Sequence, residues 1–223
     1  MMLEKPLFPM KNVSISRKAF SVSTHKTLNA IDINGKDTTR EYGRAPCRCK
    51  VLKVLPISST GFANTVLFGT CDEFGRPANV LCADGQERVL TFAFTHDDKI
   101  RVKESQIVEQ NEVVYMEGKT GNATGNHIHL EVGQGWQYKK IKDENGNFCL
   151  TNLLYAYKVF WLKEGWHKVV NFGLNGYKFS WIDGIDGEVT MNDVIHVIRV
   201  KRDPNYDYLI SIDGNKFGTP YDS

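Results

Sequence analysis

Short apolar or alternating runs, separated by turn dipeptides, dominate the chain, and helical periodicity is scarce. Runs of this length that are rich in β-branched and aromatic residues are typical of strands. The runs interpreted as strands are 51–55, 65–68, 89–94, 113–116, 127–132, 194–200 and 208–212. Asn-Gly or Asp-Gly dipeptides, which favour hairpin turns, lie at 34–35, 84–85, 145–146, 175–176, 183–184 and 213–214. The pattern predicts a mainly β protein, an antiparallel β-sheet or β-sandwich.

Length and composition are those of a globular chain with room for one full-sized domain and a small second one. The chain has 223 residues, of which 41% are hydrophobic and 11% aromatic. Aromatic residues crowd together after about residue 160, at Trp161, Trp166, Tyr177, Phe179 and Trp181. Such a cluster is more typical of a core than of a sugar-stacking surface. We therefore predict a first domain at 1–164 and a small β-rich C-terminal domain at 165–223.

Charge and the N-terminal residues bear on partners and location. The formal net charge is +2 and the basic residues are scattered. This argues against a nucleic-acid partner and allows mild attraction to anionic polymers such as cell wall. No apolar run approaches the roughly 18 residues of a membrane-spanning helix, so we expect no membrane insertion. Residues 1–16 contain no continuous apolar stretch and no small-residue cleavage site, which predicts a chain made without a secretory signal.

The cysteines do not predict a disulfide framework. Their number is odd and their spacing is loose, at Cys47, Cys49, Cys71, Cys82 and Cys149. Cys47 and Cys49 would share one strand face, but no second pair completes a zinc site. We expect free, buried thiols, which is the usual state of unpaired cysteine.

Two histidines one residue apart give the first chemical signal. Residues i and i+2 of a strand share a face, so His127 and His129 project the same way and Ile128 and Leu130 project to the other side. Two imidazoles on one face can hold a metal. The same pair is also typical of the polar face of a half-buried strand.

The residues around this pair carry a family resemblance. The pair is preceded by Gly118, Thr120, Gly121, Thr124 and Gly125 and is followed by Leu130, Glu131 and Val132. The stretch resembles the closing motif of the lysostaphin/LytM-type zinc endopeptidases, G-x-T-G-x-S/T-G-x-H-L-H-F-E. Segments 44–54, 61–66 and 90–96 are similar to the family's A-P-x-x-G-x-V-x-x-V, G-Y-G-N-x-V and Y-x-H-L segments, although Cys49 replaces a glycine. Residues 100–116 are similar to the family's V-x-x-G-x-x-V-x-x-G-x-x-I-G run, although Glu104 replaces its first glycine. The resemblance covers about residues 20–164 and implies a β metallopeptidase domain.

The resemblance implies a zinc site made by His25, Asp32 and His129. The family's compact first motif is H-x-x-x-D, and here Leu28 occupies its histidine position. His25 and the Ala-Ile-Asp at 30–32 fit a longer form of the motif, with six residues between the histidine and the aspartate. Taken alone, His25 is also typical of a solvated loop, and Asp32 of the start of a turn.

The resemblance also implies that His96 and His127 lie beside the metal without binding it. A neutral histidine can take a proton from water, and an imidazolium can stabilise an oxyanion or protonate a leaving amine. We assign His127 as the base and His96 as the oxyanion stabiliser or acid, with the roles open to exchange. His96 next to Asp97 and Asp98 is also typical of a surface ion pair. His167 and His196 are interpreted as plain strand residues.

The function implied by the resemblance is a zinc-dependent endopeptidase that hydrolyses peptide bonds in peptidoglycan stems or cross-bridges. Without a secretory signal, such an enzyme resembles a phage endolysin or a virion component that reaches the cell wall by other means. The alternative is a catalytically degenerate member of the fold that acts as a wall-binding or virion structural module. Residues 165–223 are expected to bind the wall or to shape the substrate groove.

Overall fold

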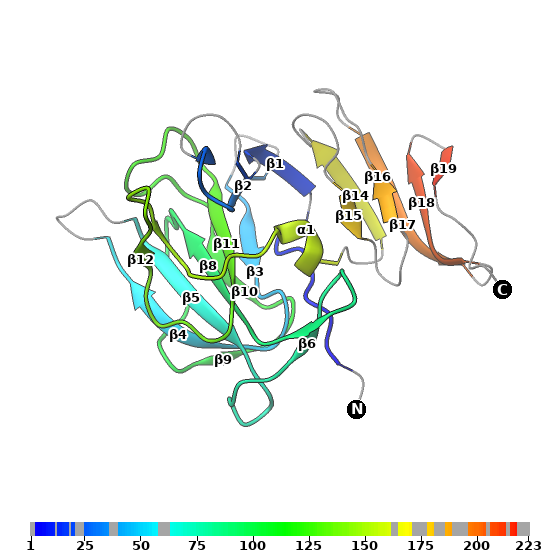
Figure 1. The fold of residues 1–223 in the computed structure, drawn as a ribbon. Coiled ribbons are helices and arrows are strands. Elements are labelled where there is room, and N and C mark those ends of the chain that lie inside the picture. Colours follow the sequence, from blue (N-terminus) through cyan, green and yellow to red (C-terminus); the bar gives the residue numbers. More distant parts are fainter. Residues whose placement is uncertain are drawn as a thin grey trace.

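The computed structural model describes residues 3–11, 13–17, 19–20, 25–35, 40–57 and 63–161, together with the backbone of the strands in 165–217. Strands make up nearly all the regular structure of these residues (Figure 1). The strands are β1 (Val13–Arg17), β2 (Ile31–Ile33), β3 (Tyr42–Arg44), β4 (Cys49–Leu55), β5 (Thr65–Thr70), β6 (Val80–Leu81), β7 (Glu87–Arg88), β8 (Leu90–Thr95), β9 (Ile107–Val108), β10 (Val113–Met116), β11 (Ile128–Gln134), β12 (Ile141–Lys142), β13 (Phe148–Cys149), β14 (Gly165–Val170), β15 (Lys178–Ser180), β16 (Asp186–Glu188), β17 (His196–Asp203), β18 (Tyr206–Ile212) and β19 (Asn215–Phe217). The short helix α1 spans Ala156–Val159. The prediction of a mainly β chain is confirmed.

A large sheet positions the candidate site. Its strand order is β19-β18-β17-β14-β1-β2-β11-β8-β5-β4-β9, and β2, β11, β8, β5 and β4 are antiparallel to their neighbours. The register sets His129 of β11 opposite Asp32 of β2 on one side and opposite Thr95 of β8 on the other. Residues distant in sequence, 97 positions apart for His129 and Asp32, thereby meet in the middle of one sheet.

The core lies under the middle strands. Ile128 and Leu130 are at most 1% exposed, on the side of β11 opposite to the histidines. Aromatic rings fill the space beneath them, with Phe94 stacked edge-on against Tyr115 at a centroid distance of 5.4 Å. Aromatic side chains supply the largest buried area per residue. They therefore anchor the face of β11 that directs His129 away from the core.

The predicted strands match the observed ones closely, because β-branched and aromatic runs fit a buried pleated surface. The strand predicted at 127–132 is observed as β11, which starts one residue later, at Ile128, because His127 forms only an isolated bridge with Gly118. The dipeptides at 84–85 and 145–146 form hairpin turns, with Gly85 and Gly146 at φ of 77° and 86°. Positions 194–195 and the dipeptides at 175–176, 183–184 and 213–214 lie outside the described residues.

The C-terminal segment is β-rich, as predicted. β14 pairs in parallel with β1 through Val13 with Val169 and Ser14 with Val170, and β17, β18 and β19 continue the sheet. His167 lies in β14 and His196 opens β17, so both are strand residues. Of the aromatic cluster, Trp161 is 5% exposed, while the side chains beyond it lie outside the described part. The boundary near residue 164 stays a prediction.

The cysteines and the helix content also bear on the predictions. All five cysteines are free and buried, as expected. Cys47 precedes β4, and its sulfur lies 3.7 Å from that of Cys49. Within the described ranges, no helix has the length and apolar character needed to cross a bilayer.

Candidate metal centre

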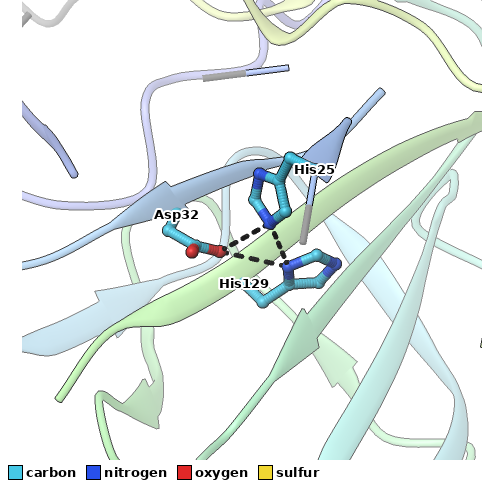
Figure 2. Close-up of side chains that lie close together, drawn as sticks. All are labelled: His25, Asp32 and His129. Atoms are coloured by element: carbon cyan, nitrogen blue, oxygen red, sulfur yellow. Dashed lines mark hydrogen bonds and ion pairs between the residues drawn. The ribbon is translucent and has the colours of Figure 1, made fainter. Parts of the chain in front are cut away.

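Three side chains meet at one point between β2, β11 and the turn that precedes β2 (Figure 2). His25 Nε2 lies 3.2 Å from Asp32 Oδ1 and 3.2 Å from His129 Nδ1. His129 Nδ1 lies 3.1 Å from Asp32 Oδ1. The three atoms therefore form a nearly equilateral triangle.

The triangle fits the chemistry of a bound zinc ion. Zinc binds histidine nitrogen and carboxylate oxygen at about 2.0–2.1 Å in tetrahedral sites, so the ligand atoms of such a site lie about 3.3 Å apart. The observed separations of 3.1–3.2 Å match one face of that tetrahedron. The side chains of His25, Asp32 and His129 are 2%, 5% and 12% exposed. Three protein ligands leave a fourth position open, which is the arrangement of catalytic zinc sites.

The turn before β2 explains how His25 reaches the site across six intervening residues. Leu28 N–H donates to the carbonyl oxygen of His25 over 3.1 Å, which closes the turn. Leu28, at the compact motif's histidine position, is 6% exposed and packs with Ala30 and Cys149. His25 is buried and Asp32 lies inside β2, so the alternatives of a solvated loop and a turn start are wrong.

Charges within the site favour an ionised Asp32. Burial raises the pKa of this carboxyl, but hydrogen bonds from His129 and His25 and their charges lower it further, to well below its usual range. For His129, burial lowers the pKa and hydrogen bonds to Asp32 and Glu131 outweigh it, so the pKa is raised. The carboxylate is therefore in the form that binds a cation.

His127 and His96 flank the metal ligands, and each ring turns its Nδ1 towards a backbone carbonyl. His127 Nδ1 lies 2.9 Å from the carbonyl oxygen of Gly125, and His96 Nδ1 lies 2.8 Å from that of Thr120. A carbonyl only accepts, so each Nδ1 carries a hydrogen and a neutral ring leaves Nε2 free. His127 Nε2 lies 3.8 Å from Asp32 Oδ1. The ring centroids of His96 and His127 are 4.6 Å apart.

His96 sits in an unusual backbone conformation. Its φ of 80° lies in the left-handed region, which costs a non-glycine residue about 1–2 kcal/mol. Asn64 holds the backbone there, since its carbonyl oxygen accepts from His96 N–H over 3.0 Å and its amide nitrogen donates to the carbonyl of Asp97 over 2.9 Å. Strain of this kind persists only where the surroundings fix it, as at functional sites.

The surroundings of His96 exclude a surface ion pair. Its ring is half-buried, and burial, followed by the charges of His127 and His129, lowers its pKa to about 4 against the opposing hydrogen bond to Thr120. Asp97 is fully buried, and Asp98 pairs with Arg40. The alternative of a surface histidine paired with these carboxylates is therefore wrong.

Of the three glycines before the His-x-His pair, Gly118 and Gly121 are each required by the backbone for a different reason. A Cβ on Gly118 would lie 2.3 Å from the backbone nitrogen of Asp98 and 2.5 Å from the carbonyl oxygen of His96. Gly121 has a φ of 72°. By contrast, a Cβ on Gly125 would meet no atom within 4 Å. The absence of a side chain at Gly118, the bridge partner of His127, therefore allows the loop carrying His96 to lie close to His127.

Two site residues were missed by the sequence reasoning. Glu131, fully buried, accepts from His129 Nε2 over 3.1 Å and from Lys140 Nζ over 2.6 Å. Burial raises the pKa of Glu131, but the Lys140 charge and the hydrogen bonds bring it to about 2. The two-residue period of the strand places Glu131 on the face of His129, which is a usable signal. No local signal marks Lys140.

A cavity of about 480 Å³ adjoins the centre. Its lining is mainly apolar with two hydroxyls and two ammonium groups: Leu55, Pro56, Ala63, Thr65, Thr95, Lys139, Lys140 and Phe148. Thr95 is the register partner of His129, and Lys140 contacts Glu131. The cavity therefore lies beside neighbours of His129, while its lining includes none of the three candidate ligands.

Comparisons with known proteins give sequence relatives and solved structures that resemble this chain. No protein-family model matches the chain. Morphogenesis protein 1 of Bacillus phage B103 is 29% identical over 179 residues, which is 80% of this chain, and the chain spans 46% of that protein's length. The catalytic domain of the antimicrobial peptidase lysostaphin from Staphylococcus simulans matches with 14% identity and a TM-score of 0.39, over 68% of this chain and 88% of that one. A structure of the SpoIIQ–SpoIIIAH pore-forming complex matches with 15% identity and a TM-score of 0.45, over 71% of this chain and 92% of that one.

Proposed function

We propose that this chain is a zinc-dependent endopeptidase of the lysostaphin type that hydrolyses peptide bonds in bacterial peptidoglycan. The observation that carries the proposal is the triangle of His25 Nε2, Asp32 Oδ1 and His129 Nδ1, with separations of 3.1–3.2 Å. Nitrogen and carboxylate donors in this number are those of catalytic zinc sites. The substrate class rests on the motif resemblance around His127 and His129.

The residues beside the ligands supply the proton transfers. When bound, a zinc ion polarises the substrate carbonyl and makes water more acidic. His127 takes the proton of the attacking water at Nε2, because its Nδ1–H is held by the Gly125 carbonyl. His96 has the same tautomer and a pKa of about 4, so its Nε2 must gain a proton before it donates to the oxyanion or leaving amine. The shared tautomer leaves an exchange of the two roles open.

The relative supports a phage setting and a second candidate function. Its name, Morphogenesis protein 1, describes a phage protein involved in morphogenesis. We propose on this basis that the chain acts on the host wall as a phage lysin or as part of a virion. The same name favours the second candidate, a catalytically inactive wall-binding or structural module. Both candidates take peptidoglycan as the partner.

The discriminating experiment measures zinc content and hydrolysis of purified peptidoglycan on the same protein. The enzyme proposal predicts about one zinc per chain and release of new amino termini from the wall. His127→Ala is expected to keep its zinc and lose at least about 100-fold in hydrolysis, since general base catalysis contributes 10²–10⁴. His167→Ala, on β14, is the matched control and is expected to change neither.

The outcomes separate the two candidates. A wild-type protein that stays zinc-free after supplementation contradicts the enzyme proposal. Bound zinc without any hydrolysis, together with co-sedimentation with isolated walls, favours the binding module. Unchanged hydrolysis in His127→Ala removes the role assigned to that residue.

A further inference from the structure

Glu131 is a fully buried carboxylate two residues beyond His129 on the same strand. Its Oε1 lies 3.1 Å from His129 Nε2 and its Oε2 accepts the backbone N–H of Leu150 over 2.7 Å. A buried carboxylate without partners is strongly destabilising. The hydrogen bonds to both oxygens of Glu131 therefore stabilise its burial, and the one from His129 joins it to a candidate metal ligand.

The hairpin of β12 and β13 supplies the other partners of Glu131. Lys140 directly precedes β12, and its Nζ lies 2.6 Å from Glu131 Oε1, while Leu150 directly follows β13. Ile141 and Cys149 pair between the two. The base of the hairpin thus holds the carboxylate from both sides, and the Lys140 side chain is only 12% exposed.

Each nitrogen of the His129 ring lies beside one carboxylate, Nε2 beside Glu131 and Nδ1 beside Asp32. An ionised carboxylate only accepts hydrogen bonds, so a hydrogen bond to Glu131 requires the His129 hydrogen at Nε2, which in the neutral ring leaves the lone pair at Nδ1. Asp32 Oδ1, 3.1 Å from Nδ1, competes by offering an acceptor on the other side of the ring. A hydrogen placed there would block the atom that the triangle of ligands requires.

We propose that Glu131 and Lys140 are positioning residues of the metal centre: the β12–β13 hairpin holds the Glu131 carboxylate against His129 Nε2, which directs the Nδ1 lone pair at His25 and Asp32. The proposal rests on the proposed metal site, although its statement about the tautomer of His129 does not require bound metal. Outer partners of this kind typically change metal affinity about 10–100-fold.

The test uses Glu131→Gln and Lys140→Met, with Lys139→Met as the matched control. Lys139 also lines the cavity but is exposed. Long-range ¹H–¹⁵N NMR of the full zinc-free chain, at alkaline pH where the imidazole is neutral, reports the tautomer of His129. Competition with a chelator reports zinc affinity. Hydrolysis of peptidoglycan is not needed for either readout.

In the wild type and in Lys139→Met, the hydrogen of His129 is expected at Nε2. In Glu131→Gln, the hydrogen shifts towards Nδ1, and in both Glu131→Gln and Lys140→Met zinc binds about 10–100-fold more weakly. An unchanged tautomer and unchanged zinc affinity in both variants overturn the proposal. Glu131 and Lys140 would then only anchor the β12–β13 hairpin.

Two safeguards keep the outcome interpretable. If Lys140→Met fails to fold because Glu131 is left as an unpaired buried charge, the double variant Glu131→Gln with Lys140→Met removes both charges and is held to the same expectation. If the wild type binds no zinc while His129 carries its hydrogen at Nε2, the proposed function fails and the positioning of the ring stands.

Discussion

At the scale of single residues, Asp97 is a buried carboxylate whose ionisation opposes folding. It is fully buried, and Oδ1 accepts from the backbone nitrogens of Lys99 and Met116 over 2.8 and 3.2 Å. Oδ2 has no hydrogen-bond partner among the described residues. Burial is the main cause that raises the pKa of Asp97 to about 6.

This predicts a pH dependence of stability with a definite sign. The folded pKa exceeds the unfolded one, so the contribution is fully present below about pH 4 and is lost as pH rises through about 6. The loss amounts to about 3 kcal/mol. Urea unfolding of wild type and Asp97→Asn at pH 5 and 7 samples about half of this loss, and the variant is expected to lose less stability over this interval. Equal losses in both proteins contradict the prediction, and Asp98→Asn serves as the control.

His96 gives a second prediction at this scale, because its φ of 80° reverses the usual order of alanine and glycine. His96→Gly is expected to be more stable than His96→Ala by about 1 kcal/mol. Chemical unfolding of the two variants measures the difference. An alanine variant at least as stable as the glycine variant would show that this position carries no left-handed strain.

At the scale of elements, a strand could be predicted from the sequence where its own run of residues is long and apolar. A strand that forms only through pairing with distant residues could not. The runs that became β4, β5, β8 and β11 are long and apolar, so their local pattern suffices. β2 has three residues and exists through its pairing with β1 and β11. Period-two reasoning correctly put the His127 and His129 side chains on one face, but Lys140 reaches Glu131 only after the β12–β13 hairpin closes.

The close approach of Gly118 to the backbone of the loop that carries His96 can be tested by substitution, with Gly125 as the control. Gly118→Ala forces its Cβ against the backbone of His96 and Asp98, so hydrolysis is expected to fall at least about 10-fold while zinc binding persists. Gly125→Ala meets no atom and is expected to be neutral. Peptidoglycan hydrolysis and zinc content measured together decide it. Equal activity of the two variants contradicts the role given to Gly118.

At the scale of the whole molecule, the C-terminal segment is linked to the site through the sheet. β14 pairs with β1, β1 pairs with β2, and β2 carries Asp32. Sequence reasoning predicted a β-rich segment here but not this pairing, because two short runs that are distant in sequence carry no local sign of being neighbours. The segment therefore has a structural route to the centre in addition to its proposed contact with the wall.

Deletion of residues 165–223 separates the two proposed roles of this segment. A wall-binding role predicts reduced co-sedimentation with isolated walls and intact cleavage of a short soluble peptide. A groove-shaping role predicts the reverse, because β1 loses the partner that supports β2. Zinc content of the shortened chain controls for loss of the centre, and no change in either assay contradicts both roles.

The central claim is that His25, Asp32 and His129 hold one zinc ion, and it is tested most directly by zinc stoichiometry in wild type and His25→Ala. His25 is the informative ligand, because it reaches the triangle across six intervening residues while Leu28 fills the compact position with an apolar side chain. We predict about one zinc per wild-type chain and, in His25→Ala, affinity at least about 100-fold weaker, in line with the loss of one of three ligands. A zinc-free wild type, or a variant that binds zinc as tightly as the wild type, would contradict the account.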